Sequence, residues 1–139
     1  MSSQARIRAL LELRLNNWAI GQELSVVWQN ISATPANTTY LRAYLIPALR
    51  ISEDLEGKHR SYIGVFQVSI VTPSHEGPNA GEVIADALDV LFPVNLRLTS
   101  VAATTIVAQV MTPMEPADAL QDSASWILPV SCRVRSDTI

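Results

Sequence analysis

The sequence predicts an α+β domain in which a mixed, mainly antiparallel sheet of about five strands carries two helices on one face, in the order α-β-β-β-α-β-β. The main observation is the run from Arg60 to Pro93, which has the pattern of a strand, a short turn and an amphipathic helix. A strand followed by a helix that lies back on the sheet is the nucleus of a two-layer domain. Periodic segments on either side of this run supply the first helix and the remaining strands.

The strand in this run is predicted to lie in the middle of the sheet. β-branched and aromatic residues occupy both of its alternating faces, which is typical of a strand that is buried on both sides. One face consists of Tyr62, Phe66, Val68 and Ile70, and the other of Ile63, Val65, Gln67, Ser69 and Val71. Gly64 leaves a gap in the face of Tyr62 and Phe66, where another backbone or a large side chain can approach.

The helix that follows is predicted to begin at Asn79, after a turn that contains Pro73 and Pro78. Asn79 is a good N-cap, and Glu82 three residues later completes a pattern like a capping box. We expect the apolar face of this helix to consist of Val83, Ile84, Ala87, Leu88 and Leu91, with Glu82, Asp86 and Asp89 pointing away.

The remaining elements follow from the same periodicities. A first helix is expected from Ser2 or Ser3 to Asn16 or Asn17, with an apolar face of Ile7, Leu10, Leu11, Leu15 and Trp18. The other strands are expected at 24–30, 39–50, 104–111 and 126–135, with a turn at 113–116 and a polar connection at 117–125. We expect one domain over residues 1–139.

Two prolines restrict where their strands can lie. Because proline cannot donate a ladder hydrogen bond, Pro47 indicates a break in its strand or a sheet edge, and Pro129 indicates an edge or a bulge. The polar segment Ile51–His59 between two predicted strands is expected to be the long tip of a hairpin.

The composition favours a protein that assembles with partners. Only 17% of the residues are charged while 48% are apolar, compared with about 25% charged residues in typical domains. A surface with few charged residues is often covered by other subunits. The alternative is a solvent-exposed surface rich in Ser, Thr, Asn and Gln, which would give the same percentages. The net charge of −3 argues against a sequence-blind nucleic-acid binder. Neither a signal peptide nor a membrane helix is indicated, so we expect synthesis in the cytoplasm.

The sequence offers no set of residues that indicates catalysis, a metal or a cofactor. His59 and His75 stand alone in predicted loops, and Cys132 occupies an apolar strand position that favours a buried, inert thiol. The acidic cluster of Glu53, Asp54 and Glu56 lacks the spacing of a calcium loop. We therefore interpret these carboxylates as part of a solvated or partner-contacting hairpin tip.

Four stretches together resemble the tail terminator proteins of tailed phages and prophages. They are the first helix ending at Trp18 with the strand that carries Trp28 and a Thr-Pro loop; the segment 39–42; the segment 62–73 with the following Ala85-Asp86, Leu88 and 91–93; and 120–122 with Trp126 and 129–130. The match spans nearly the whole chain, and it consists of structural residues in a fixed order, with no catalytic motif among them.

This resemblance implies a structural virion protein and not an enzyme. About six copies would form a hexameric ring that caps the head-proximal end of the tail tube, stops tube polymerisation and provides the head-tail joining surface. The implied partners are the chain itself, the tail tube protein and a head-completion or connector protein. DNA would only pass through the ring, and neither a membrane nor a cofactor is implied. The protein would be assembled in the host cytoplasm and end in the tail or neck of the virion.

Two further expectations accompany this reading. We predict that the charged hairpin tip of Glu53, Asp54, Glu56, Lys58, His59 and Arg60 contacts a neighbouring subunit or the tube, the alternative being a loop without a partner. The alternative function is another neck, head-closure or tail-assembly protein of similar fold, which would bind the head-side portal complex.

Overall fold

The computed structural model describes residues 3–28, 38–51, 60–73, 79–99, 107–121 and 125–138. The elements follow one another as α1 (Ser3–Gly21), β1 (Ser25–Val27), β2 (Tyr40–Ile51), β3 (Arg60–Pro73), α2 (Asn79–Leu91), β4 (Arg97–Thr99), β5 (Val107–Val110), β6 (Glu115–Pro116), β7 (Leu120–Gln121) and β8 (Ser125–Thr138). No helix in these ranges is both long enough and apolar enough to cross a membrane.

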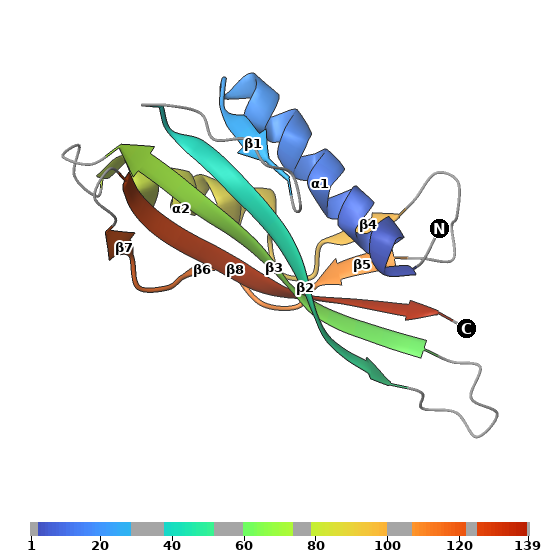
Figure 1. The fold of residues 1–139 in the computed structure, drawn as a ribbon. Coiled ribbons are helices and arrows are strands. Elements are labelled where there is room, and N and C mark those ends of the chain that lie inside the picture. Colours follow the sequence, from blue (N-terminus) through green and yellow to red (C-terminus); the bar gives the residue numbers. More distant parts are fainter. Residues whose placement is uncertain are drawn as a thin grey trace.

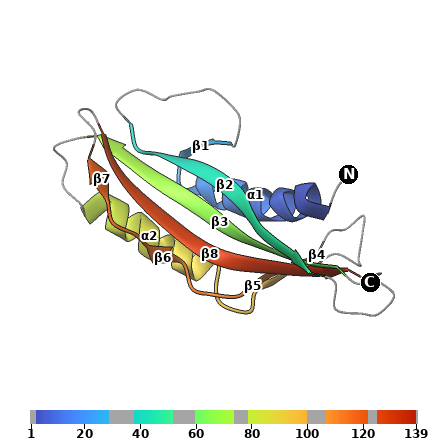
Figure 2. The same ribbon diagram turned by 60° about the horizontal axis from the view of Figure 1, so that its bottom comes forward.

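The long strands β2, β3 and β8 lie side by side and form the body of a curved sheet (Figures 1 and 2). The strand order is β1-β2-β3-β8-β5-β4, and β6 and β7 also pair with β8. β1 runs parallel to β2, and every other pair is antiparallel. The predicted α+β class and the central place of β3 are therefore confirmed. The strands outnumber the expected five because several of them, such as β6 and β7, are only two residues long.

One face of the sheet packs against both helices. Register brings Leu41, Ile70 and Leu128 into one row across β2, β3 and β8, with Ala43, Val68 and Val130 in the next. These rows share one buried core with side chains of both helices, including Ile7, Leu11 and Leu15 of α1 and Ala85 and Leu88 of α2. Phe92, just after α2, meets Phe66 edge-on at 5.4 Å between ring centroids. The expected placement of two helices on one face is confirmed.

The buried face of α2 differs from the prediction at one edge. Val83 was expected in the core but is 60% exposed, whereas Gly81, Ala85 and Leu88 form the buried stripe. The reason is the close packing of the first turn of α2 on the indole ring of Trp126, which requires the glycine to face the sheet. The expected apolar face is thus confirmed at Leu88, which is in the core, and at Ile84 and Leu91, which pack against it, and is wrong at Val83.

The two prolines behave differently. The register between β2 and β3 shifts between Pro47 and Leu49. Because β1 pairs only with residues 40–42 of β2, Pro47 lies where β2 is an edge of the described sheet, as expected. The edge that Pro129 predicts is wrong, because β8 has β3 on one side and β5, β6 and β7 on the other. The alternative, a bulge, agrees with the register on the second side: Pro116 pairs with Val130 and Leu120 with Ile127, so residues 117–119 oppose only 128–129. The carbonyl oxygen of Pro129 accepts a 2.8 Å hydrogen bond from the N–H of Ala117. Its imide nitrogen therefore also points toward that side, where it interrupts no hydrogen bond to β3.

Candidate interaction surfaces

The predicted hairpin tip falls largely outside the described residues. Glu53, Asp54, Glu56, Lys58 and His59 all lie in 52–59, and Arg60 opens β3 opposite Thr138. The stem of the hairpin is described, since Ile51 pairs with Ser61. The hairpin is thus confirmed, and the role of its tip stays a prediction.

Two features of the described titratable residues bear on metal binding and nucleophilic chemistry. In the described part of the chain, no three His, Cys, Asp or Glu side chains gather closely enough to hold a metal ion. Cys132 is buried among the apolar side chains of the core. Burial raises the pKa of its thiol to about 12, so the nucleophilic thiolate is scarce at neutral pH. His59 and His75 lie outside the described residues.

The face of the sheet opposite the helices, here called the outer sheet face, carries a mixture of apolar and basic side chains. Ile46 is 46% exposed on it, and Ile63 and Val65 are half-buried. By register, the charged residues of this face in the described ranges are Arg42, Arg97, Arg133, Arg135, Glu115 and Asp137. The four arginines outnumber the two carboxylates, so the face is net positive.

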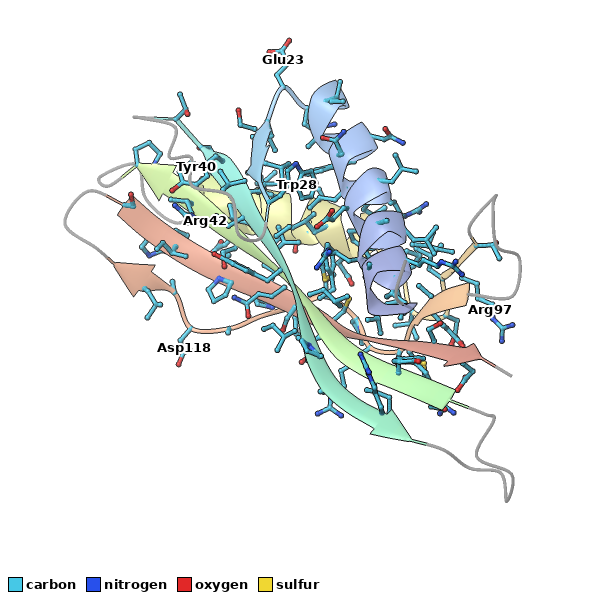
Figure 3. The ribbon with its side chains drawn as sticks, turned by 45° about the vertical axis from the view of Figure 1, so that its right-hand side comes forward. Glu23, Trp28, Tyr40, Arg42, Arg97 and Asp118 are labelled. Carbon is cyan, nitrogen blue, oxygen red and sulfur yellow. The ribbon has the colours of Figure 1, made fainter. Side chains whose placement is uncertain are left out.

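Three side chains of β2 form a fixed polar cluster on this face. The guanidinium of Arg42 lies over the ring of Tyr40 at 5.5 Å from its centroid, and its Nε and Nη2 donate hydrogen bonds of 3.4 and 3.3 Å to the Tyr40 hydroxyl. Hydrogen bonds to Tyr40 and then to Tyr44 raise the pKa of Arg42. Figure 3 shows Tyr40 and Arg42 next to each other on β2. These contacts orient the guanidinium of Arg42 within the protomer.

A second polar cluster joins the far ends of β3 and β8. The Oγ of Ser61 donates a hydrogen bond to the carboxylate of Asp137, and Arg135 donates to both groups, with Nε 3.0 Å from Oδ2 of Asp137 and Nη2 3.2 Å from Oγ of Ser61. Asp137 thus neutralises much of the charge of Arg135. The positive character of the outer sheet face depends mainly on Arg42, Arg97 and Arg133.

The outward side of α2 has the opposite charge. Glu82, Asp86 and Asp89 are exposed there with two valines, Val83 and Val90, of which Val90 is 79% exposed. The helix sequence contains no basic residue. Asp89 lies at the border of this group, where its Oδ1 accepts a 3.3 Å hydrogen bond from the backbone N–H of Met114. We call these five residues the acidic stripe.

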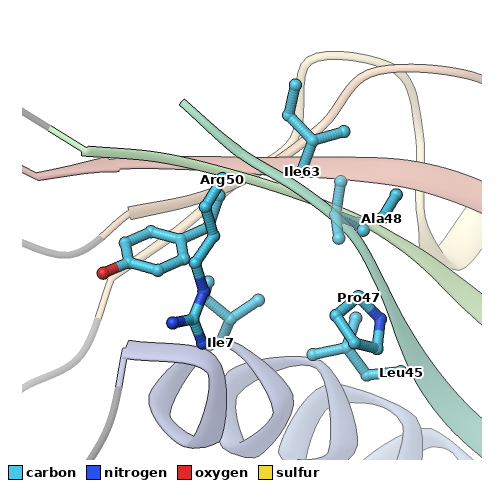
Figure 4. A pocket seen from close by; sticks show the side chains of 9 residues that line it. Ile7, Leu45, Pro47, Ala48, Arg50 and Ile63 are labelled. Carbon is cyan, nitrogen blue, oxygen red and sulfur yellow. The ribbon is translucent and has the colours of Figure 1, made fainter. Parts of the chain in front are cut away.

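A hollow of about 190 Å³ opens between the first turns of α1 and the outer half of the β2–β3 hairpin (Figure 4). Its walls include Ile7, Leu45, Pro47 and Gly64. The guanidinium of Arg50 lies over the ring of Tyr62, 5.1 Å from the centroid. The described residues that line the hollow are apolar apart from this stacked pair, and none of them is a Ser, Cys, His, Asp or Glu.

Neither charged surface is among the predictions from the sequence, although local signals for both are present. The alternation in 40–46 places Tyr40, Arg42 and Tyr44 on one face, and the spacing of Glu82, Asp86 and Asp89 places them on one side of a helix. What the sequence lacked was the sheet register that adds Arg97 and Arg133 to the face of Arg42.

The chain is similar in sequence and in fold to known proteins. A family model described as "Phage tail terminator protein" matches residues 6–133. A solved structure that carries no functional name is 42% identical, with a TM-score of 0.80 over 98% of this chain and 96% of that chain. A chain from the virion of a native gene transfer agent particle is 15% identical, with a TM-score of 0.63 over 93% of this chain and 92% of that chain. At that identity the likeness shows the fold alone. No curated protein matches.

Proposed function

Because the chain belongs to the phage tail terminator family and is therefore a structural tail protein, we propose that about six copies close into a ring on the head-proximal end of the tail tube. There the ring stops tube polymerisation and presents the surface to which head-completion proteins bind. The family match over residues 6–133 is the observation that carries this proposal.

The two faces of the molecule support a ring. A contact between two different surfaces gives an open filament unless the rotation between neighbours closes it. The outer sheet face and the acidic stripe differ in sign and in shape, so a contact between such surfaces is of this heterologous kind. A ring also presents two unlike ends, which suits a terminator that binds the tube below and other proteins above.

The implied partners are the tail tube protein, a head-completion or connector protein and further copies of the chain. DNA passes through the ring without being read. The net charge of −3 is compatible with that passage, since it does not favour adhesion to phosphates. The role is steric, and we propose no catalytic step, cofactor or metal for it.

The test is to add the purified protein to tube protein that is polymerising. We expect tube length to stop increasing at a low ratio of this chain to tube protein, and electron microscopy to show extra density at one end of each tube. Unchanged elongation together with binding to the portal complex would instead support the head-closure alternative. Unchanged elongation with no binding to either assembly would remove both functions.

A further inference from the structure

We propose that, in the ring inferred above, the acidic stripe on α2 of one copy docks onto the outer sheet face of the next copy. This inference rests on the proposed function, because it specifies how the subunits of that ring touch. It commits to a second copy of this chain as the occupant of the outer sheet face, and the complementary charges and exposed apolar residues of the two surfaces support it.

The receiving surface has the composition of an interface core. Tyrosine and arginine are the residue types that most often dominate binding energy, and the half-buried side chains of Arg42 and Tyr44 present both at this surface. Tyr40 beside them is itself only 6% exposed. The hydrogen bonds and the stacking contact within this cluster already restrict Arg42, so less side-chain entropy is lost on binding. Beside this cluster lie Ile46 and Val65, which offer apolar area to a partner.

The docking surface supplies what this face lacks. Val83 and Val90 are seven residues apart, so they lie two turns apart on the same side of α2 and form a narrow apolar ridge. Glu82 and Asp86 flank this ridge. An apolar ridge bordered by carboxylates matches an apolar sheet surface bordered by Arg42 and Arg133, because each carboxylate can pair with a guanidinium while the valines are buried.

The two surfaces lie on opposite sides of the molecule. α2 packs with its buried stripe on the inner face of the sheet, so the acidic stripe points away from that sheet while the outer sheet face points the other way. A copy can therefore use both surfaces at once, one toward each neighbour. Each sheet would then lie between its own α2 and the α2 of the next copy, which is a stable layered arrangement.

Two charge-reversal variants test this contact. The first, Arg42→Glu/Arg133→Glu, makes the outer sheet face acidic, and the second, Glu82→Arg/Asp86→Arg, makes the stripe basic. Each variant alone brings like charges together, and we expect its assembly on tubes to fall at least tenfold relative to the unaltered chain. In an equal mixture, every sheet face can meet a stripe of opposite charge if the two variants alternate. We therefore expect the mixture to restore rings, which requires an even number of subunits.

The measurement is sedimentation velocity with and without tail tubes. Arg6→Glu and Glu23→Lys reverse charges outside both surfaces and are expected to assemble as the unaltered chain does. Melting curves establish that each variant is folded, and Arg133→Glu alone, at an exposed position, replaces the double variant if the latter does not fold. Variants that assemble normally, or folded variants whose mixture does not assemble, would overturn the inference while the proposed function stands. If the unaltered chain itself forms no ring on tubes, the proposed function fails and the inference fails with it.

Discussion

The Nε of Arg14 in α1 donates a 2.7 Å hydrogen bond to the carbonyl oxygen of Leu91, the last residue of α2. The carbonyl groups at the end of a helix have no partner within the helix, and the helix dipole makes that end negative. A guanidinium placed there satisfies one of these carbonyl groups and offsets the partial charge. This contact joins the two helices through residues that are 77 positions apart in the sequence.

Replacement of Arg14 by methionine should therefore lower the stability of the fold. The variant keeps much of the apolar stem but loses the hydrogen bond and the charge, and we expect a decrease of about 1–2 kcal/mol in the free energy of unfolding. Urea denaturation with an unchanged m-value would measure it. Arg6→Met, which removes an arginine from the same helix, is the matched control. Equal midpoints for the two variants would contradict the assigned role of Arg14.

Gly81 is where the first turn of α2 contacts β8. A Cβ atom at this position would lie 2.8 Å from Cζ3 of Trp126, which is closer than real Cβ contacts. Helix propensity favours alanine over glycine by about 1 kcal/mol, but overpacking costs about 1–3 kcal/mol. We expect Gly81→Ala to be destabilising on balance, with a change in tryptophan fluorescence as the Trp126 ring moves.

The control for Gly81→Ala is Gly21→Ala at the end of α1, where a Cβ atom would meet nothing within 4 Å. This second variant should have an unfolding midpoint equal to or above that of the unaltered chain. A higher midpoint for Gly81→Ala as well would mean that Trp126 adjusts without cost.

The contact of Gly81 also shows where sequence reasoning reaches its limit. The apolar periodicity of α2 is enough to predict the helix but leaves open whether Val83 or Gly81 completes the buried face. Trp126, 45 positions further along the chain, decides between them by requiring a residue without a side chain. β6 and β7 illustrate the same limit, because two-residue strands exist only through their pairing with β8. Local signals at 113–116 indicate a turn, and the long-range ladder overrides them.

The features that depend on alternation alone were predictable. Both faces of β3 follow from period-two spacing, and the register confirms them from Ser61 to Thr72. The alternation of Tyr40, Arg42 and Tyr44 was equally visible. The outer sheet face as a surface was not, because its arginines come from β2, β4 and β8, and only strand pairing brings these strands together.

Gly64 provides a second test of close packing, this time within the sheet. The sequence predicts a gap on this face of β3, and the structure fills it with backbone: a Cβ atom would lie 3.0 Å from the carbonyl oxygen of Ile46 and 3.4 Å from Cδ1 of Leu45. A backbone oxygen in a paired strand cannot move aside easily. We expect Gly64→Val to lower the free energy of unfolding by about 1–3 kcal/mol, although valine favours strands.

Thermal unfolding measures this effect, and Val65→Ile at the adjacent half-buried position is the control for added volume in the same strand. An unchanged melting curve for Gly64→Val would show that the chain at this position is open to solvent.

Cys132 gives the protein a predictable loss of stability in alkaline solution. In the folded chain burial raises the pKa of this thiol from 9.0 to about 12. Between these two values the unfolded chain releases the thiol proton and the folded chain keeps it, so the unfolded state binds fewer protons and stability falls as the pH rises. At pH 10, one unit above the unfolded value, this single group should lower the free energy of unfolding by about 1.4 kcal/mol. Cys132→Ala removes this thiol, while all other groups that titrate in alkaline solution remain in both the unaltered chain and the variant. In urea denaturation, the stability advantage of the unaltered chain over the variant should therefore shrink by about 1.4 kcal/mol between pH 8 and pH 10. A constant difference would show that the thiol ionises as readily in the folded chain as in the unfolded one.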